Sequence, residues 1–214
     1  MARWSAWAWL LLAFFGGAGL AKERTAVCTI VTIRVIDQSA LPGWVLWPAT
    51  AKASRLFSAT GVCLAWKGAT GVSRQEALQA NDEMQMLAES IELLIKSSSA
   101  DEHKGALAFA APFARTGVRI TIFYDRIAAL RSASAPAAET ILACVLAHEI
   151  GHVFLRTNGH SESGLMRATG KSGDFGQMAH GLLAFTPVDA ELIRRNVQVS
   201  RNRDCGVPRP GGRP

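Results

Sequence analysis

The sequence predicts a single α/β (α+β) domain in which helices, among them one long helix and one C-terminal helix, cover a twisted mixed sheet. Its 214 residues suffice for one domain, and 49% of them are apolar, enough for a sizeable core. Short runs rich in β-branched residues alternate with segments whose apolar residues recur every three or four positions. No repeat, long linker or extended heptad pattern is present, which excludes disordered, collagen-like and coiled-coil classes.

The N-terminal segment, residues 1–21, has the features of a secretory signal peptide. Arg3 supplies the short positive start, and an apolar run of about a dozen residues follows over 4–15. Gly19 and Ala21 are small at the two positions that a signal peptidase inspects, so we expect cleavage near Ala21. An uncleaved membrane anchor is the alternative, although the run is short for a hydrocarbon layer about 30 Å thick.

The mature chain is expected to contain five β-strands, of which the first and the last have the clearest sequence patterns. Residues 28–36 are rich in β-branched side chains, and residues 118–124 alternate clearly between apolar and polar. Shorter apolar runs predict three further strands, and residues 71–90 suit a helix or a loop equally. The predicted strands are 28–36, 62–66, 91–95, 106–110 and 118–124.

Three helices are predicted from apolar residues spaced by three and four. Residues 44–60 form the first, in which Pro48 is tolerated only in the first turn and Gly61 ends the segment. Residues 136–156 form a long helix and residues 187–197 a final one, each beginning with a proline in its first turn.

The domain is expected to extend over residues 22–200. Residues 201–214 are expected to form a basic, Pro- and Gly-rich disordered tail.

The charge balance and the cysteines narrow the function classes. The formal net charge is +6, and loss of Arg3 with the leader lowers it to +5, which is only mildly basic. No nucleic-acid-binding module accompanies this charge, so we expect no nucleic-acid partner. An even number of cysteines in an exported chain suggests two disulfides, with three alternative pairings open. The cysteines are Cys28, Cys63, Cys144 and Cys205.

The pattern H-E-x-x-H lies within the long predicted helix, as His148-Glu149-Ile150-Gly151-His152. Two histidines four positions apart share one helix face, so both imidazoles can reach one ion. Neutral imidazole is a preferred ligand of Zn²⁺, and a catalytic zinc site uses three protein ligands. The pattern therefore predicts one zinc ion per chain, bound by His148 and His152, with Glu149 as the general base. Two surface histidines beside a solvated glutamate are the alternative interpretation.

The residues after this motif resemble those of the metzincin zinc metallopeptidases. Gly159-His160 and then Met166 follow the motif, in the order in which that family places a third histidine ligand and a Met-containing turn beneath the metal. The resemblance implies a zincin/metzincin-like domain with His160 as the third ligand and Met166 as the structural Met-turn residue. It covers most of the mature chain in element order, but only residues 148–166 are specific.

The spacing departs from the family pattern H-E-x-x-H-x-x-G-x-x-H. Leu155 and Asn158 occupy the positions of its glycine and third histidine. A helix longer by about one turn, followed by a bend at Asn158-Gly159, would return His160 to the metal. The rival third ligands are Glu162 on the same loop, or Glu191 or Asp189 near the last helix.

Residues 106–110 resemble the edge strand against which metzincins pair an extended substrate, because their small side chains would leave the backbone accessible. A plain buried strand fits these residues equally. His103, in a polar segment, and His180 are expected at the surface.

The resemblance implies an exported zinc-dependent endopeptidase that acts on a peptide or protein substrate. Two alternatives stay open: a secreted binding module that keeps the fold without useful catalysis, and a hydrolase of a non-peptide amide such as a cell-wall cross-link. We expect a secreted or periplasmic protein without stable membrane insertion after cleavage.

Overall fold

A computed structural model describes residues 28–68, 91–98, 102–113, 118–130, 137–168 and 172–204. The predicted signal peptide, the ambiguous stretch 71–90 and the last ten residues of the predicted tail, 205–214, lie outside the described residues. Residues 201–204 are helical, so the structure corrects the start of the predicted tail.

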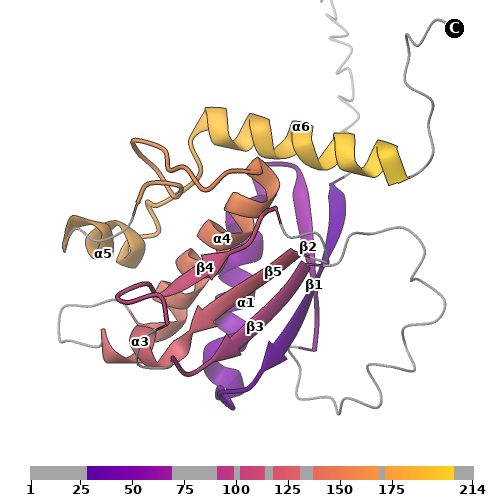
Figure 1. Cartoon of the computed structure of the whole chain (residues 1–214). Helices are drawn as coiled ribbons and strands as arrows, with labels where there is room; N and C mark the ends of the chain where they lie inside the picture. Colours follow the sequence, from indigo (N-terminus) through magenta and orange to yellow (C-terminus); the bar gives the residue numbers. More distant parts are fainter. Residues whose placement is uncertain are drawn as a thin grey trace, which may run out of the picture.

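The described strands form one mixed sheet with the order β2-β1-β3-β5-β4 (Figure 1). Strands β2, β1, β3 and β5 run parallel to one another. The short strand β4 pairs antiparallel with β5 at one edge of this sheet. The strands are β1 (Thr29–Asp37), β2 (Val62–Lys67), β3 (Ile91–Lys96), β4 (Ala108–Ala110) and β5 (Val118–Phe123). Their order and near-identical bounds confirm the predicted fold class.

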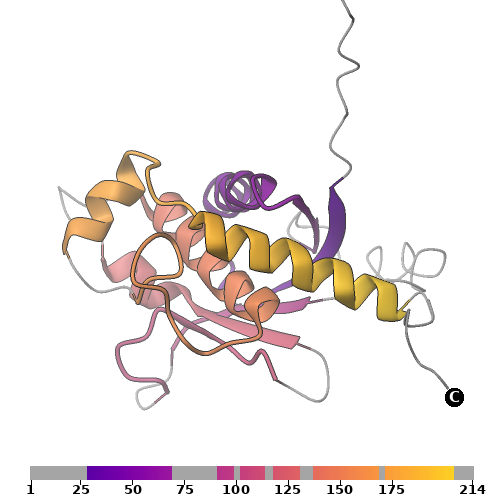
Figure 2. The ribbon, with the colours of Figure 1, turned by 90° about the horizontal axis from the view of Figure 1, so that it is seen from above.

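Two long helices lie on the same side of the sheet (Figure 2). They are α1 (Gly43–Ser58), between β1 and β2, and α4 (Ala138–Leu155), and they pack against each other along their length. A third long helix, α6 (Pro187–Asp204), lies against the C-terminal half of α4. The Asn196 side-chain amide of α6 donates to the Phe154 carbonyl of α4 at 2.9 Å, which links the two helices.

The hydrophobic core lies between the sheet and the helices α1 and α4. In β3, Ile91, Leu93 and Ile95 are buried, whereas the residues that alternate with them are half-buried, because successive side chains of a strand point to opposite faces. Helix α4 is buried on nearly every side from Ile141 to Phe154. By length and composition α4 could cross a membrane, but 78% of it is buried inside the domain, as in a core helix.

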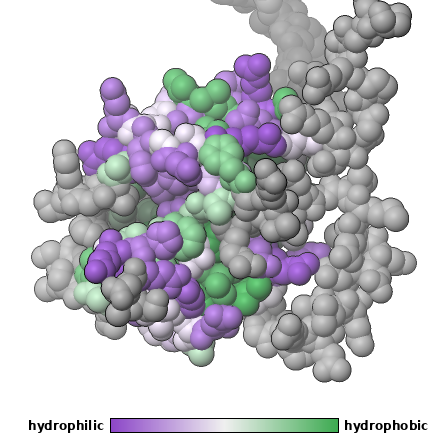
Figure 3. All heavy atoms as spheres, in the orientation of Figure 1, coloured by the Kyte–Doolittle hydropathy of each residue, from purple (hydrophilic) through white to green (hydrophobic). Residues whose placement is uncertain are grey.

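The surface is mixed in polarity. The face seen in Figure 3 carries hydrophilic residues interspersed with smaller apolar areas. Large apolar side chains that are exposed include Trp44 and Trp47 in the first turns of α1.

The structure corrects several element predictions. Pro48 lies inside α1 rather than in its first turn, and α1 stays continuous because Val45, Ala49 and Ala53 bury its apolar face. Helix α4 begins at Ala138, two residues after the predicted start. Two short helices were missed, α3 (Tyr124–Ala129), where the fifth predicted strand was expected to end, and α5 (Ser172–Ala179), within a glycine-rich segment.

One disulfide connects the described cysteines. Cys28 and Cys63 are bonded, and they tie the start of β1 to the start of β2. Cys144 is a free thiol buried in α4, so the expectation of a second disulfide through Cys144 is wrong. Cys205 lies outside the described residues.

Candidate metal centre

His148, Glu149 and His152 all lie in the buried helix α4. Their exposed fractions are 7%, 7% and 6%, so little bulk water reaches these side chains. The two histidines are four residues apart, and the helix therefore places their rings on one side, with centroids 4.6 Å apart.

Backbone carbonyls orient both buried rings. The Nδ1 of His148 donates to the Leu165 carbonyl at 2.8 Å, and the Nδ1 of His152 donates to the Thr157 carbonyl at 2.9 Å. A carbonyl oxygen only accepts, so each Nδ1 carries the proton and each Nε2 keeps a free lone pair. The two Nε2 atoms lie 3.0 Å apart. Two lone pairs at this distance repel each other unless a cation lies between them, and the pair therefore fits a metal ion.

The end of α4 turns the chain back toward these rings. Arg156 caps the helix with a left-handed backbone, φ 52°, and its N–H donates to carbonyls of the last turn. The Gly159 N–H then donates to Thr157 Oγ1 at 2.9 Å, which tightens the following bend. The bend was predicted at Asn158-Gly159. In the structure the residue with a left-handed backbone is instead Arg156, because helix α4 ends at Leu155 and Arg156 is its cap.

This return brings His160 next to the helical pair. Its ring centroid lies 5.3 Å from that of His148 and 4.9 Å from that of His152. One ligand nitrogen from each of the three histidines lies within 4.8 Å of the others. His160 is exposed, so the three nitrogens surround a point that is open on one side. Such a set matches the three protein ligands of a catalytic zinc site.

The rival third ligands lie elsewhere. Among the described residues the histidines alone form a group that could hold a metal ion, and Glu162 is an exposed residue outside it. Asp189 is buried and accepts hydrogen bonds from Ser161 Oγ and Thr186 Oγ1. Glu191 pairs with Arg194 on the exposed side of α6.

Burial tunes the protonation of these groups. It lowers the pKa of His148 to about 4, against the opposing effect of the Leu165 carbonyl, and it also lowers the pKa of His152. Burial raises the pKa of the Glu149 carboxyl to about 7. The neutral form is favoured in each case because a charge is costly away from water. The histidines are thus kept in the form that binds metals.

Met166 lies directly behind the histidine pair. It is 1% exposed, and a Cβ added to Gly151, between the two helical histidines, would overlap its sulfur. The turn that carries it is fixed by Gly164, whose φ is 72° and whose missing side chain leaves room for the Ala184 carbonyl. The Leu165 N–H donates to that carbonyl at 2.7 Å. Met166 therefore packs against helix α4 where Gly151 has no side chain.

A cleft of about 570 Å³ opens beside the histidines. One wall is the edge strand β4 with the residues before it, and the other is α4, from which Glu149 faces the same space. Apolar side chains also line this cleft: Leu130, Ile141, Cys144, Val145, Met178 and Leu183. The sequence did not predict these cleft residues, because they come from separate segments of the chain, and Met178 lies in a segment without a predicted element.

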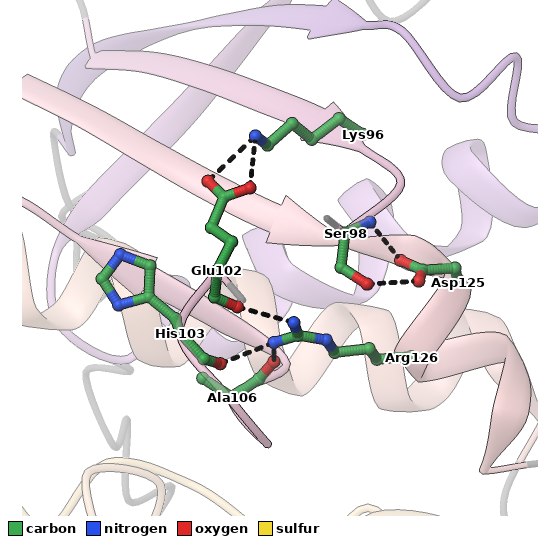
Figure 4. A network of polar contacts seen from close by, with 7 residues as sticks. All are labelled: Lys96, Ser98, Glu102, His103, Ala106, Asp125 and Arg126. Atoms are coloured by element: carbon green, nitrogen blue, oxygen red, sulfur yellow. Dashed lines mark hydrogen bonds and ion pairs between the residues drawn. The ribbon is translucent and has the colours of Figure 1, made fainter. Parts of the chain in front are cut away.

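Arg126 holds the segment that leads into β4 (Figure 4). Its guanidinium donates to the carbonyls of Glu102, His103 and Ala106 at 2.6, 2.7 and 2.6 Å, and lies 4.4 Å above the Phe123 ring. Ion pairing of Lys96 with Glu102 joins the same segment to β3. The sequence offered no signal for this network, because its acceptors are backbone carbonyls.

The remaining histidines lie away from the metal-binding group. His103 is exposed and stacks on Phe109, with ring centroids 4.0 Å apart, and His180 is exposed at the end of α5. Their predicted surface positions are confirmed.

The comparisons with known proteins support the fold. No protein-family model and no curated protein matches the chain. Among solved structures, the chain is similar to the crystal structure of archaemetzincin from Methanopyrus kandleri, with a TM-score of 0.51. The sequences are 15% identical, and the match covers 82% of this chain and 98% of that chain. The chain therefore has the archaemetzincin fold, with three histidines able to hold one metal ion beside its cleft.

Proposed function

We propose that the chain is a zinc-dependent peptidase of the metzincin type. The observation that carries this proposal is the facing pair of Nε2 lone pairs on His148 and His152, with His160 beside them. Two nitrogens bound to one tetrahedral zinc ion at about 2.0–2.1 Å lie about 3.3 Å apart, close to the 3.0 Å between the two Nε2 atoms. The buried carboxyl of Glu149 lies next to this set and faces the same cleft.

The chain's own residues supply the rest of the chemistry. When bound, zinc supplies Lewis-acid chemistry that polarises a carbonyl and makes water more acidic. Glu149 accepts the proton of the attacking water and delivers it to the leaving amine, for which a pKa near neutrality is suited. Met166 supports the ligand helix from behind and takes no part in proton transfer.

An extended peptide is the proposed substrate. The strand β4 lies at the edge of the sheet and borders the cleft, so its outer backbone groups face the space in which a substrate strand would lie. The apolar part of the cleft suits a large apolar side chain of that peptide.

We further propose that the protein works outside the cytoplasm. The disulfide between Cys28 and Cys63 supports an oxidising compartment, secreted or periplasmic. A signal peptide over 1–21, removed near Ala21, agrees with this location. The proposed partners are peptide or protein substrates, and neither nucleic acid nor a stable membrane anchor is part of the proposal.

Metal analysis combined with a peptide-library digest tests the function. The wild-type protein should contain one zinc ion per chain and cleave peptides until a chelator is added. Glu149→Ala should keep its zinc and lose hydrolysis, because only the proton shuttle is removed. Glu162→Ala, at an exposed glutamate on the same loop, is the control and should behave as the wild type.

Other outcomes identify the alternatives. Zinc binding with cleavage of a cell-wall amide but of no peptide would favour an amidase. Zinc binding without turnover of either substrate would favour a binding module. Unchanged turnover in Glu149→Ala would refute the assigned role of this residue.

A further inference from the structure

The loop that carries His160 is longer than the metzincin pattern by two residues. In that pattern the third histidine follows the second by six positions, whereas His160 follows His152 by eight. A longer loop has more freedom, and ordering it on metal binding costs more free energy. The rings of His148 and His152 are held by carbonyls, but none of the described residues forms a hydrogen bond with the His160 ring.

Ser161, the residue directly after His160, is held in two ways. Its N–H donates to the Met166 carbonyl at 2.9 Å. Its Oγ donates to Asp189 Oδ1, also at 2.9 Å. The first bond ties the loop to the Met-containing turn, and the second ties it to α6.

Asp189 is a rigid anchor for this bond. It lies in the first turn of α6, is 6% exposed, and its Oδ2 accepts a hydrogen bond from Thr186 Oγ1 at 2.7 Å. The Asp189 N–H donates back to Thr186 Oγ1 at 3.1 Å, which makes a reciprocal cap of the helix start. Because the positive end of the helix dipole favours a carboxylate there, the acceptor is well placed for Ser161.

We infer that Ser161 and Asp189 are positioning residues that hold His160 at the metal and thereby set the metal affinity. This rests on the proposed function to the extent that His160 is a ligand. Asp189, a rival ligand by sequence, is assigned a different role: it acts through Ser161 and has no contact with the ion. The tether to α6 compensates for the longer loop.

The first test measures zinc affinity by competition with a chelator in the full-length protein. Ser161→Ala should weaken zinc binding by about tenfold to a hundredfold, the usual effect of losing an outer partner of a metal ligand. Ser161→Thr keeps the hydroxyl and should retain nearly wild-type affinity. Asn196→Ala removes another hydrogen bond of α6, to the Phe154 carbonyl, and should leave zinc affinity unchanged. Circular dichroism of the metal-free forms checks that each variant folds.

A double-mutant cycle with His160→Ala separates positioning from a general structural effect. His160→Ala alone should weaken zinc binding strongly, and adding Ser161→Ala should cause no further loss, because the held ligand is gone. The Co²⁺ absorption spectrum of Ser161→Ala should shift toward that of His160→Ala, since both loosen the third ligand.

The outcomes distinguish the inference from the proposed function. Wild-type zinc affinity in Ser161→Ala, or an equal loss with and without His160, would overturn the inference and leave the metal site standing. Wild-type affinity in His160→Ala would instead show that the third ligand is elsewhere, and the proposed site would fall.

Discussion

At the residue scale, burial acts in opposite directions on the pKa values of neighbouring side chains of α4. Removal from water lowers the pKa of His148 to about 4 and raises that of Glu149 to about 7. Both shifts favour the neutral form, because the protein interior solvates charge poorly. The imidazole thus stays ready for a metal, and the carboxyl changes its charge near neutral pH.

The raised pKa of Glu149 predicts a pH-dependent stability of the metal-free protein. The folded form holds this proton more tightly than the unfolded chain, whose carboxyl titrates near 4.5, so the stabilisation is complete below pH 4.5. It is lost as the pH rises through about 7. In Glu149→Gln this loss should be absent, and relative to that variant the wild type should lose up to about 3 kcal/mol.

Urea denaturation of both chelator-treated proteins between pH 4 and 8 measures this difference. The His148 contribution changes in the opposite sense, since stability from a buried neutral histidine is lost as the pH falls from 6.5 toward about 4. It is common to both proteins and cancels in the comparison. Parallel stability curves would contradict the assigned shift.

At the element scale, close contact between α4 and the Met166 turn depends on Gly151. A methyl group there would overlap the Met166 sulfur and approach Phe185 Cε1 to 3.1 Å. Overpacking in Gly151→Ala should cost about 1–3 kcal/mol. The gain in helix propensity of about 1 kcal/mol offsets part of this cost, so the net destabilisation should be up to about 2 kcal/mol.

Thermal denaturation and zinc competition measure the effect of Gly151→Ala. Zinc affinity should also fall, because Gly151 lies between the two helical histidines. Gly176→Ala in α5 is the matched control, since a Cβ there meets nothing within 4 Å, and it should be at least as stable as the wild type, with a gain of up to about 1 kcal/mol from helix propensity. Equal stability of the two variants would argue against tight packing under the metal site.

The segment before β4 supports a second prediction at this scale. Arg126→Met removes the bonds to three carbonyls of the segment that leads into one wall of the cleft. If the proposed function holds, the variant should raise KM for extended peptides more than it lowers kcat, because the proposed substrate would contact this wall away from the reacting atoms.

Steady-state kinetics and zinc content test this variant against Lys96→Met. That control removes the ion pair with Glu102 in the same network but leaves the Arg126 bonds in place. Zinc content should be unchanged in both. A loss of kcat with constant KM in Arg126→Met would contradict a role in shaping the substrate wall.

The elements that were predicted correctly have strong local patterns. The β1 and β5 runs have β-branched residues, and α4 is a long segment that is apolar on nearly every side. The errors arose where packing overrides local preference: Pro48 is accommodated inside α1 by its buried face, and Tyr124 begins α3 instead of ending a strand.

At the scale of the whole molecule, the disulfide and the metal centre lie at different parts of the sheet. The disulfide joins β1 and β2, and β2 is the edge opposite β4, which borders the cleft. It closes a loop with a sequence separation of 35 residues. Replacing Cys28 and Cys63 by serine should lower the free energy of unfolding by about 3–4 kcal/mol.

Denaturant unfolding of the wild type and the double serine variant measures this loss. Zinc affinity of the folded variant should stay at the wild-type value, because the cleft is at the other edge. A marked fall in affinity under conditions where the variant is folded would show that the bond also supports the site.

The sequence by itself determined the fold class, the helix that carries H-E-x-x-H and the three histidines to consider, because periodicity and spacing are local properties of the chain. Only the tertiary structure showed that His160, and not Glu162, Glu191 or Asp189, lies beside His148 and His152 in a group that could hold a metal ion. The position of His160, eight residues after His152, depends on the path of the intervening loop. This path is set by the left-handed backbone of Arg156 and by the hydrogen bond from Ser161 to Asp189 of α6. The cleft wall and the free thiol of Cys144 were likewise decided by packing between segments far apart in sequence, whose contacts leave no local pattern.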